Sequence, residues 1–250
     1  MEQEDKKALS GRRILDLADE KASFCSKLLA DMGAEVFKIE RPGGDTSRTV
    51  GPFWGNRLHP EKSLSFWYHN TGKLGITLNL DSEEGQQIFR RLAQNADVVV
   101  ESFPPGYLDK LGAGYQALSE LNPGLIMASV TGFGQDGPHR EYHSCDIVAS
   151  ATGGQMSVCG APDTPPLKPY GQQPYYLSSL FAATGILLAL RQRKQSSRGQ
   201  HIDISMQEAV AATLEHVMVR YFHEGTVSRR QGSRHWNDSF CTLPCKDGHI

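Results

Sequence analysis

Closely spaced cysteine pairs are missing from this 250-residue chain. The five cysteines are scattered, and the two nearest, Cys241 and Cys245, lie four residues apart with no second pair after them. This pattern excludes a zinc site built from two cysteine pairs, and we expect no metal. The odd number of cysteines indicates reduced thiols, so we expect a cytoplasmic protein.

Long hydrophobic runs and an excess of one charge are missing as well. The longest apolar stretch, residues 177–190, is short and is interrupted by serine, threonine and glycine, so it predicts a buried helix rather than a membrane span. The first residues are charged and do not resemble a secretory signal. With 26 basic and 28 acidic residues the formal net charge is −2. We therefore expect neither nucleic acid nor a membrane as a partner.

What is present is the pattern of an α/β protein. Short apolar or alternating segments at residues 13–17, 35–40, 75–80, 96–101 and 125–130 predict strands. Helical spacing at residues 21–32, and a capped helix beginning near Ser82, separate them. Strands that alternate with helices indicate parallel β-α-β units, so we predict an open Rossmann-like sheet flanked by helices. No G-x-G-x-x-G sequence follows the first strand, which disfavours a generic dinucleotide site.

The second half of the chain has a different texture. Residues 132–173 are rich in glycine, proline and short polar residues and are predicted to be loops that form a site. Helices are predicted at about residues 177–195 and 205–223, with a strand at 199–205 between them, and residues 246–250 predict a hairpin turn that leads into a strand. We expect a large domain over residues 1–195, followed by residues 196–250 as a helix and linker into a smaller domain, whose C-terminal part is missing from this chain.

An ordered series of short motifs carries a resemblance to a known family. The series comprises GAEVFKIE (33–40) with Arg41 and Asp45, NTGK (70–73), ESFPPG (101–106), TGFGQDGP (131–138) and GQHIDIS (199–205). In this order and spacing the chain resembles the family III CoA-transferases, the group of formyl-CoA, carnitine and bile-acid CoA-transferases. The α-methylacyl-CoA racemases share their fold. The resemblance implies coenzyme A or an acyl-CoA as substrate, a carboxylic acid as the second reactant, and interlocked dimers.

The resemblance also implies a CoA site in the Rossmann-like half. CoA carries a diphosphate and a ribose phosphate, which arginine and lysine neutralise, and ligands of open α/β sheets lie at the carboxyl ends of the strands. Several of the matching positions lie near predicted strand ends or in adjoining loops. The positions that match CoA contacts of the family are Lys21, Ala22, Arg41, Lys73, Ser102, Phe103, Lys110, His143, Cys145 and Asp146.

The family's nucleophile has no counterpart at the matching place. Family III transferases use an aspartate that forms a mixed anhydride and then an aspartyl-CoA thioester, and only a carboxylate can form both. The place of this aspartate falls on Pro174 or Tyr175, and no acidic residue occurs between Asp163 and Asp203. The sequence therefore predicts a member without a catalytic residue of its own at this place.

Three functions remain open from the sequence. In the first, the chain is a non-catalytic subunit paired with a paralogous catalytic chain. In the second, it is an acyl-CoA isomerase, racemase or dehydratase that uses His143, Tyr175 or Tyr176 as acid–base groups. In the third, it is a CoA-binding module without turnover. The first is favoured, because CoA-side residues are kept while the nucleophile is absent.

Overall fold

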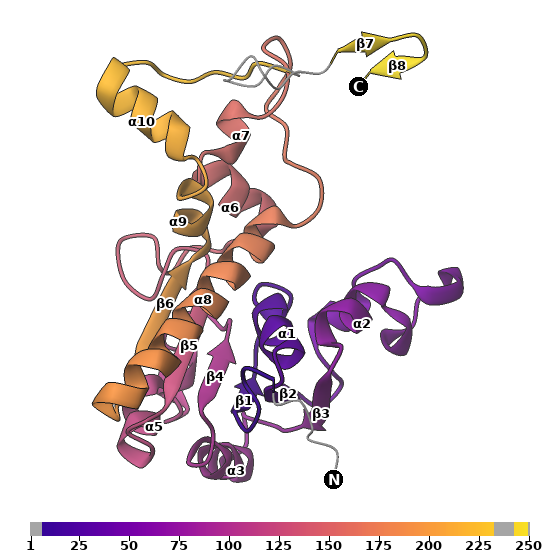
Figure 1. Cartoon of the computed structure of the whole chain (residues 1–250). Helices are drawn as coiled ribbons and strands as arrows, with labels where there is room; N and C mark the ends of the chain where they lie inside the picture. The colour runs from indigo at the N-terminus through magenta and orange to yellow at the C-terminus, as the bar shows by residue number, and fades with distance from the viewer. Residues whose placement is uncertain (1–6, 233–242, 250) are drawn as a thin grey trace.

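A six-stranded parallel sheet organises the chain. The computed structural model describes residues 7–232 and 243–249 (Figure 1). The sheet has the order β3-β2-β1-β4-β5-β6, and every neighbouring pair is parallel. The predicted open Rossmann-like sheet is therefore confirmed. Its strands are β1 (Arg13–Asp16), β2 (Glu35–Glu40), β3 (Lys73–Thr77), β4 (Val98–Glu101), β5 (Ile126–Thr131) and β6 (His201–Ser205).

Helices cover both faces of the sheet. On one face α1 and α8 bury an apolar cluster against β1, β4 and β5, and Figure 1 shows α8 running along the sheet. On the other face α3, α4 and α5 bury a second cluster around Phe89 and Leu118. The helices are α1 (Ser23–Asp31), α2 (Leu64–Asn70), α3 (Glu83–Ala93), α4 (Tyr107–Lys110), α5 (Tyr115–Leu121), α6 (Asp146–Thr152), α7 (Gln155–Val158), α8 (Gln173–Ser196), α9 (Met206–Ala211) and α10 (Glu215–Glu224), with 3-10 turns at Thr46–Thr49, Trp54–Asn56 and Pro60–Lys62.

Several predicted elements differ from the structure, among them β3, which spans residues 73–77 instead of 75–80. The loop predicted for residues 132–173 contains α6 and α7, whose short lengths hide any helical period. Helix α8 begins at Gln173, four residues before the predicted start, and Pro174 lies in its first turn, where a missing N–H costs nothing. The helix predicted at 205–223 is divided into α9 and α10, and the Thr213 hydroxyl donates to the Val210 carbonyl oxygen at the break, at 2.7 Å.

The end of the chain forms the predicted hairpin. Strands β7 (Pro244–Cys245) and β8 (Gly248–His249) pair antiparallel across a two-residue turn. Strand β6 lies beyond residue 195 and pairs with β5 in the main sheet, while the division into two domains stays a prediction. Among the described residues, no helix has the length and apolar character needed to cross a bilayer.

Candidate functional site

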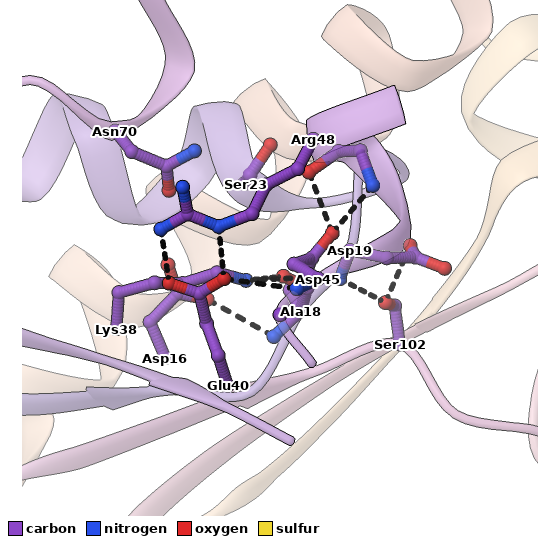
Figure 2. A network of polar contacts seen from close by, with 12 residues as sticks. Asp16, Ala18, Asp19, Ser23, Lys38, Glu40, Asp45, Arg48, Asn70 and Ser102 are labelled. Carbon is purple, nitrogen blue, oxygen red and sulfur yellow. Dashed lines mark hydrogen bonds and ion pairs between the residues drawn. The ribbon is translucent and has the colours of Figure 1, made fainter. Parts of the chain in front are cut away.

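A buried ion pair joins the end of β1 to the start of β3. The Lys73 ammonium donates to Asp16 Oδ2 at 2.8 Å, to the Ser23 carbonyl oxygen at 2.9 Å and to Asn70 Oδ1 at 2.9 Å. Both charged side chains are almost completely buried, and Figure 2 shows Asp16, Ser23 and Asn70 in this network. Burial lowers the pKa of Lys73, and the Asp16 carboxylate opposes that shift. All three ammonium protons are thus used inside the protein, and Lys73 is the first residue of its strand rather than a residue at its carboxyl end.

A second set of charges lies on β2 and in the segment that follows it. The Lys38 ammonium donates to Asp45 Oδ2 at 2.9 Å and to the Ala18 carbonyl oxygen, and the Arg48 guanidinium holds both oxygens of Glu40, at 2.6 and 2.8 Å (Figure 2). Burial alone would raise the pKa of Asp45 and of Glu40, but their cationic partners lower both below the ordinary range. The two carboxylates are therefore ionised and neutralised by neighbouring cations.

The loop after β1 is fastened to the end of β4. The Ser102 hydroxyl donates to Asp19 Oδ1 at 2.8 Å and accepts the Asp19 backbone N–H at 2.9 Å (Figure 2). Lys21 forms an ion pair with the same carboxylate, and Ala22 is fully buried just before α1. The structure thus brings together Lys21, Ala22 and Ser102, three of the residues predicted to contact CoA.

A cleft of about 380 Å³ opens at the carboxyl ends of the strands, and we call it the switch-point cleft. Its walls include Leu17 after β1, Arg41 after β2, Leu78 after β3 and Ser102 after β4. The strand order reverses between β1 and β4, and in open α/β sheets this reversal is where ligands bind. Two of these four residues, Arg41 and Ser102, are among those predicted to contact CoA, and their contact with CoA stays a prediction.

Aromatic rings form one wall of the switch-point cleft. The rings of Phe103 and Tyr107 lie 4.7 Å apart, and the Tyr107 hydroxyl donates to Asp81 Oδ1 at 2.9 Å. Arg41 is exposed at the rim, and its Nε donates to the Gly44 carbonyl oxygen at 3.3 Å. The cleft thus offers a flat apolar surface together with an accessible guanidinium.

Other predicted residues lie outside this cleft. Lys110 is the exposed last residue of α4, and His143 and Cys145 are exposed before α6. Cys145 carries a free thiol, while Cys241 lies outside the described residues. Of the predicted set, Arg41, Ser102 and Phe103 line the switch-point cleft, while His143, Cys145 and Asp146 lie just before or at the start of α6.

Tyr175, which with Pro174 is one of the two residues that the resemblance matches to the family's aspartate, carries a buried phenol near the start of α8. Tyr175 is 7% exposed, and its hydroxyl oxygen accepts the Asp146 backbone N–H at 3.1 Å. The Asp146 carboxylate accepts from the Lys168 ammonium at 2.5 Å. Burial, followed by the charge of Glu20, raises the pKa of Tyr175, so its phenol is neutral near pH 7. Sequence reasoning found Asp146 and Tyr175 but missed Lys168 and Glu20, because these residues come from loops with no readable pattern.

A histidine that sequence reasoning missed lies beside the next tyrosine. The His69 ring stacks on Tyr176 with centroids 5.7 Å apart, and its Nδ1 lies 2.8 Å from the Ser65 carbonyl oxygen. Burial lowers the pKa of His69, and Lys73 and Lys27 lower it further, while the contact with the Ser65 carbonyl opposes the shift. This imidazole is therefore neutral near pH 7, and Nδ1 carries its proton.

Comparisons with known proteins agree with these features. The family described as "CoA-transferase family III" matches residues 9–250. The succinyl-CoA:(R)-benzylsuccinate CoA-transferase subunit BbsE of Thauera aromatica is 36% identical over 238 residues, which cover 95% of this chain and 58% of that protein. The beta subunit of succinyl-CoA–L-malate CoA-transferase of Chloroflexus aurantiacus is 38% identical over 245 residues, covering 97% of this chain and 58% of that protein.

A solved structure agrees as well. A CAIB/BAIF family protein from Brucella suis superposes with a TM-score of 0.90 at 35% identity, and the match covers 98% of this chain and 65% of that one. The chain therefore spans somewhat more than half the length of the proteins it matches.

Proposed function

The chain belongs to family III of the CoA-transferases, and from this premise we propose that it binds coenzyme A or an acyl-CoA thioester in the switch-point cleft. In this proposal it takes part in the transfer of CoA between carboxylic acids as the non-catalytic subunit of a hetero-oligomer. A paralogous chain in an interlocked dimer supplies the nucleophilic carboxylate. Two relatives are named as subunits of CoA-transferases that use succinyl-CoA, which supports this assembly and suggests succinyl-CoA as the donor to test.

The lining of the switch-point cleft supports CoA as the ligand. The Phe103 ring provides a face for the adenine base, and Arg41 provides a guanidinium for a phosphate. Lys38 and Lys73 are buried and paired with carboxylates, so the proposal assigns phosphate neutralisation to Arg41, the exposed cation at the rim of the cleft.

The observation that carries the non-catalytic role is the buried Tyr175 hydroxyl in the place of the expected aspartate. A CoA-transfer nucleophile must form an anhydride and then a thioester, which requires a carboxylate. A neutral phenol whose oxygen already accepts the Asp146 N–H offers neither that chemistry nor a free approach. The Asp146 carboxylate forms an ion pair with Lys168, which supports a structural role for Asp146.

A calorimetric titration of CoA into the purified chain tests the binding part of the proposal. We expect one CoA per chain, and we expect Arg41→Gln to weaken binding about ten-fold, because a charge-assisted phosphate contact is lost. Arg91→Gln is the matched control, since Arg91 is exposed on α3 and does not line the switch-point cleft. A flat titration, or equal losses in the two variants, would contradict the proposed site.

A second candidate function is an acyl-CoA isomerase, racemase or dehydratase. The observation that favours it is the neutral His69 imidazole stacked on Tyr176, because a base and a phenol lie together beside the start of α8. His143, the histidine predicted for this role, is exposed on a loop. Turnover of an acyl-CoA by the isolated chain, abolished by His69→Gln, would favour this function. CoA binding without turnover, alone or with any partner, would indicate a CoA-binding module.

A further inference from the structure

A second cavity, of about 290 Å³, lies across the β4–α4 loop from the switch-point cleft. Its lining includes Glu101, Ser129 and His201, which come from three neighbouring strands. Pro104 and Tyr107 line both cavities. The loop after β4 therefore forms part of the wall of both cavities.

A hydrogen-bonded chain connects this wall to the second cavity. Glu101 is 4% exposed, and its Oε2 accepts the Phe103 backbone N–H at 2.8 Å. Ser129 is the partner of Glu101 in the register of β4 and β5, beside its carboxyl, and the Ser129 hydroxyl oxygen lies 2.9 Å from His201 Nε2. The His201 ring stacks on Tyr115 with centroids 5.2 Å apart. A buried carboxyl is thus linked through one hydroxyl to an imidazole that lines the cavity.

The surroundings place the ionisation of Glu101 near neutral pH. Burial raises the pKa of Glu101 to about 7, while the bonds from Ser129 and from the Phe103 N–H, together with the charge of Lys21, oppose the shift. Asp109 on α4 raises it further. Burial lowers the pKa of His201, although Asp203 and Asp109 oppose that shift, so the imidazole is neutral when Glu101 titrates.

We propose that Glu101 is a positioning residue for coenzyme A. The Glu101 carboxylate fixes Phe103 at the switch-point cleft, and the proton that neutralises this carboxylate travels through Ser129 and His201. The inference rests on the proposed function, because it concerns the same cleft. A proton that arrives at His201 Nδ1 displaces the Nε2 proton to the Ser129 oxygen, and the Ser129 proton moves to Glu101. One proton enters and one is gained by the carboxyl, so the relay is balanced.

Ionised and neutral Glu101 hold the loop with different strength. A carboxylate accepts the Phe103 N–H in a charge-assisted bond, and a neutral carboxylic acid accepts it more weakly. The cleft wall is therefore better fixed above pH 7 than below it. Glu101→Gln reproduces the neutral state at every pH, because the amide oxygen accepts from Phe103 while the amide group donates to Ser129.

The Phe103 amide proton provides a test that does not need CoA. We expect its NMR chemical shift to titrate with a midpoint near pH 7 in the wild type and to stay constant in Glu101→Gln. Ser129→Ala removes a bond that favours the ionised form, so we expect its midpoint to move to higher pH. An unchanged titration in Glu101→Gln, or an unchanged midpoint in Ser129→Ala, would overturn the inference.

CoA affinity provides the second arm. At pH 8 we expect the wild type to bind CoA roughly five-fold more tightly than Glu101→Gln, because the charge-assisted bond is present only in the wild type. At pH 6 the two proteins should bind equally. Equal affinities at pH 8, or tighter binding by the variant, would overturn this inference alone. No CoA binding by the wild type at either pH would overturn the proposed function as well.

Discussion

Replacing Lys73 with methionine separates two roles for this residue, a ligand contact and an internal ion pair. The family resemblance matches Lys73 to a CoA contact, while the structure buries its ammonium against Asp16. Methionine keeps much of the side-chain length and removes the charge. The Asp16 carboxylate would keep the Ser26 hydroxyl at 2.6 Å and the Ala18 N–H at 3.0 Å but would lose its only described cation at ion-pair distance.

The expected cost follows from the burial of the pair. The side chains of Lys73 and Asp16 are 1% and 0% exposed, and breaking a pair this deeply buried costs about 3–5 kcal/mol, since one charge is left without compensation. Asn70 Oδ1 also loses a donor at 2.9 Å. In a domain of this size each kcal/mol lowers Tm by roughly 2–4 °C, so we expect a fall in Tm of roughly 10 °C.

Urea unfolding and CoA titration of Lys73→Met together distinguish an internal ion pair from a ligand contact. We expect Lys73→Met to lose about 3–5 kcal/mol of unfolding free energy and to keep wild-type CoA affinity while folded. Lys27→Met is the control, because Lys27 pairs with the half-exposed Asp31 and should cost about 1 kcal/mol or less. A stable Lys73→Met protein with weakened CoA binding would refute the structural assignment.

The remaining predictions concern pH and backbone packing. The pKa of Asp45 is lowered, so the stabilisation that its carboxylate provides is present above pH 4 and is lost as the pH falls through the pKa of the folded state. We expect the unfolding free energy of Asp45→Asn, measured with urea, to vary less with pH in that range. A Cβ at Gly199 would lie 1.7 Å from the Leu125 carbonyl oxygen, and we expect Gly199→Ala to cost about 2–4 kcal/mol. Gly75→Ala is its control, since a Cβ there meets nothing within 4 Å, and equal costs in the two alanine variants would contradict this packing.

The fold was largely predictable because its strands are buried and continuous in pattern. Every residue of β4 and β5 is buried, and most are apolar, as expected of strands covered on both faces. β2 was predicted with its observed bounds from its alternating pattern. β3 was predicted two residues late, because Lys73 does not read as a buried strand residue without its partner Asp16. The short helices α6 and α7 were missed because four to seven residues contain too few turns to show a period.

The candidate site was predictable only where motifs mark strand ends. Arg41, Ser102 and Phe103 follow strands and do line the switch-point cleft. Whether a lysine is free or paired depends on residues distant in the chain, as the 57-residue separation of Lys73 and Asp16 illustrates. The same holds for Glu101, whose neighbour Ser129 lies on β5, 28 residues further along the chain.

We propose that this chain binds CoA but does not supply the carboxylate nucleophile. The most direct measurement mixes the chain with its catalytic paralogue and an acyl-CoA, traps with hydroxylamine, and locates the hydroxamate by peptide mass spectrometry. We predict a hydroxamate on a carboxylate of the paralogue and none on this chain. A hydroxamate on any carboxylate of this chain, Glu20 and Asp146 included, would contradict the account.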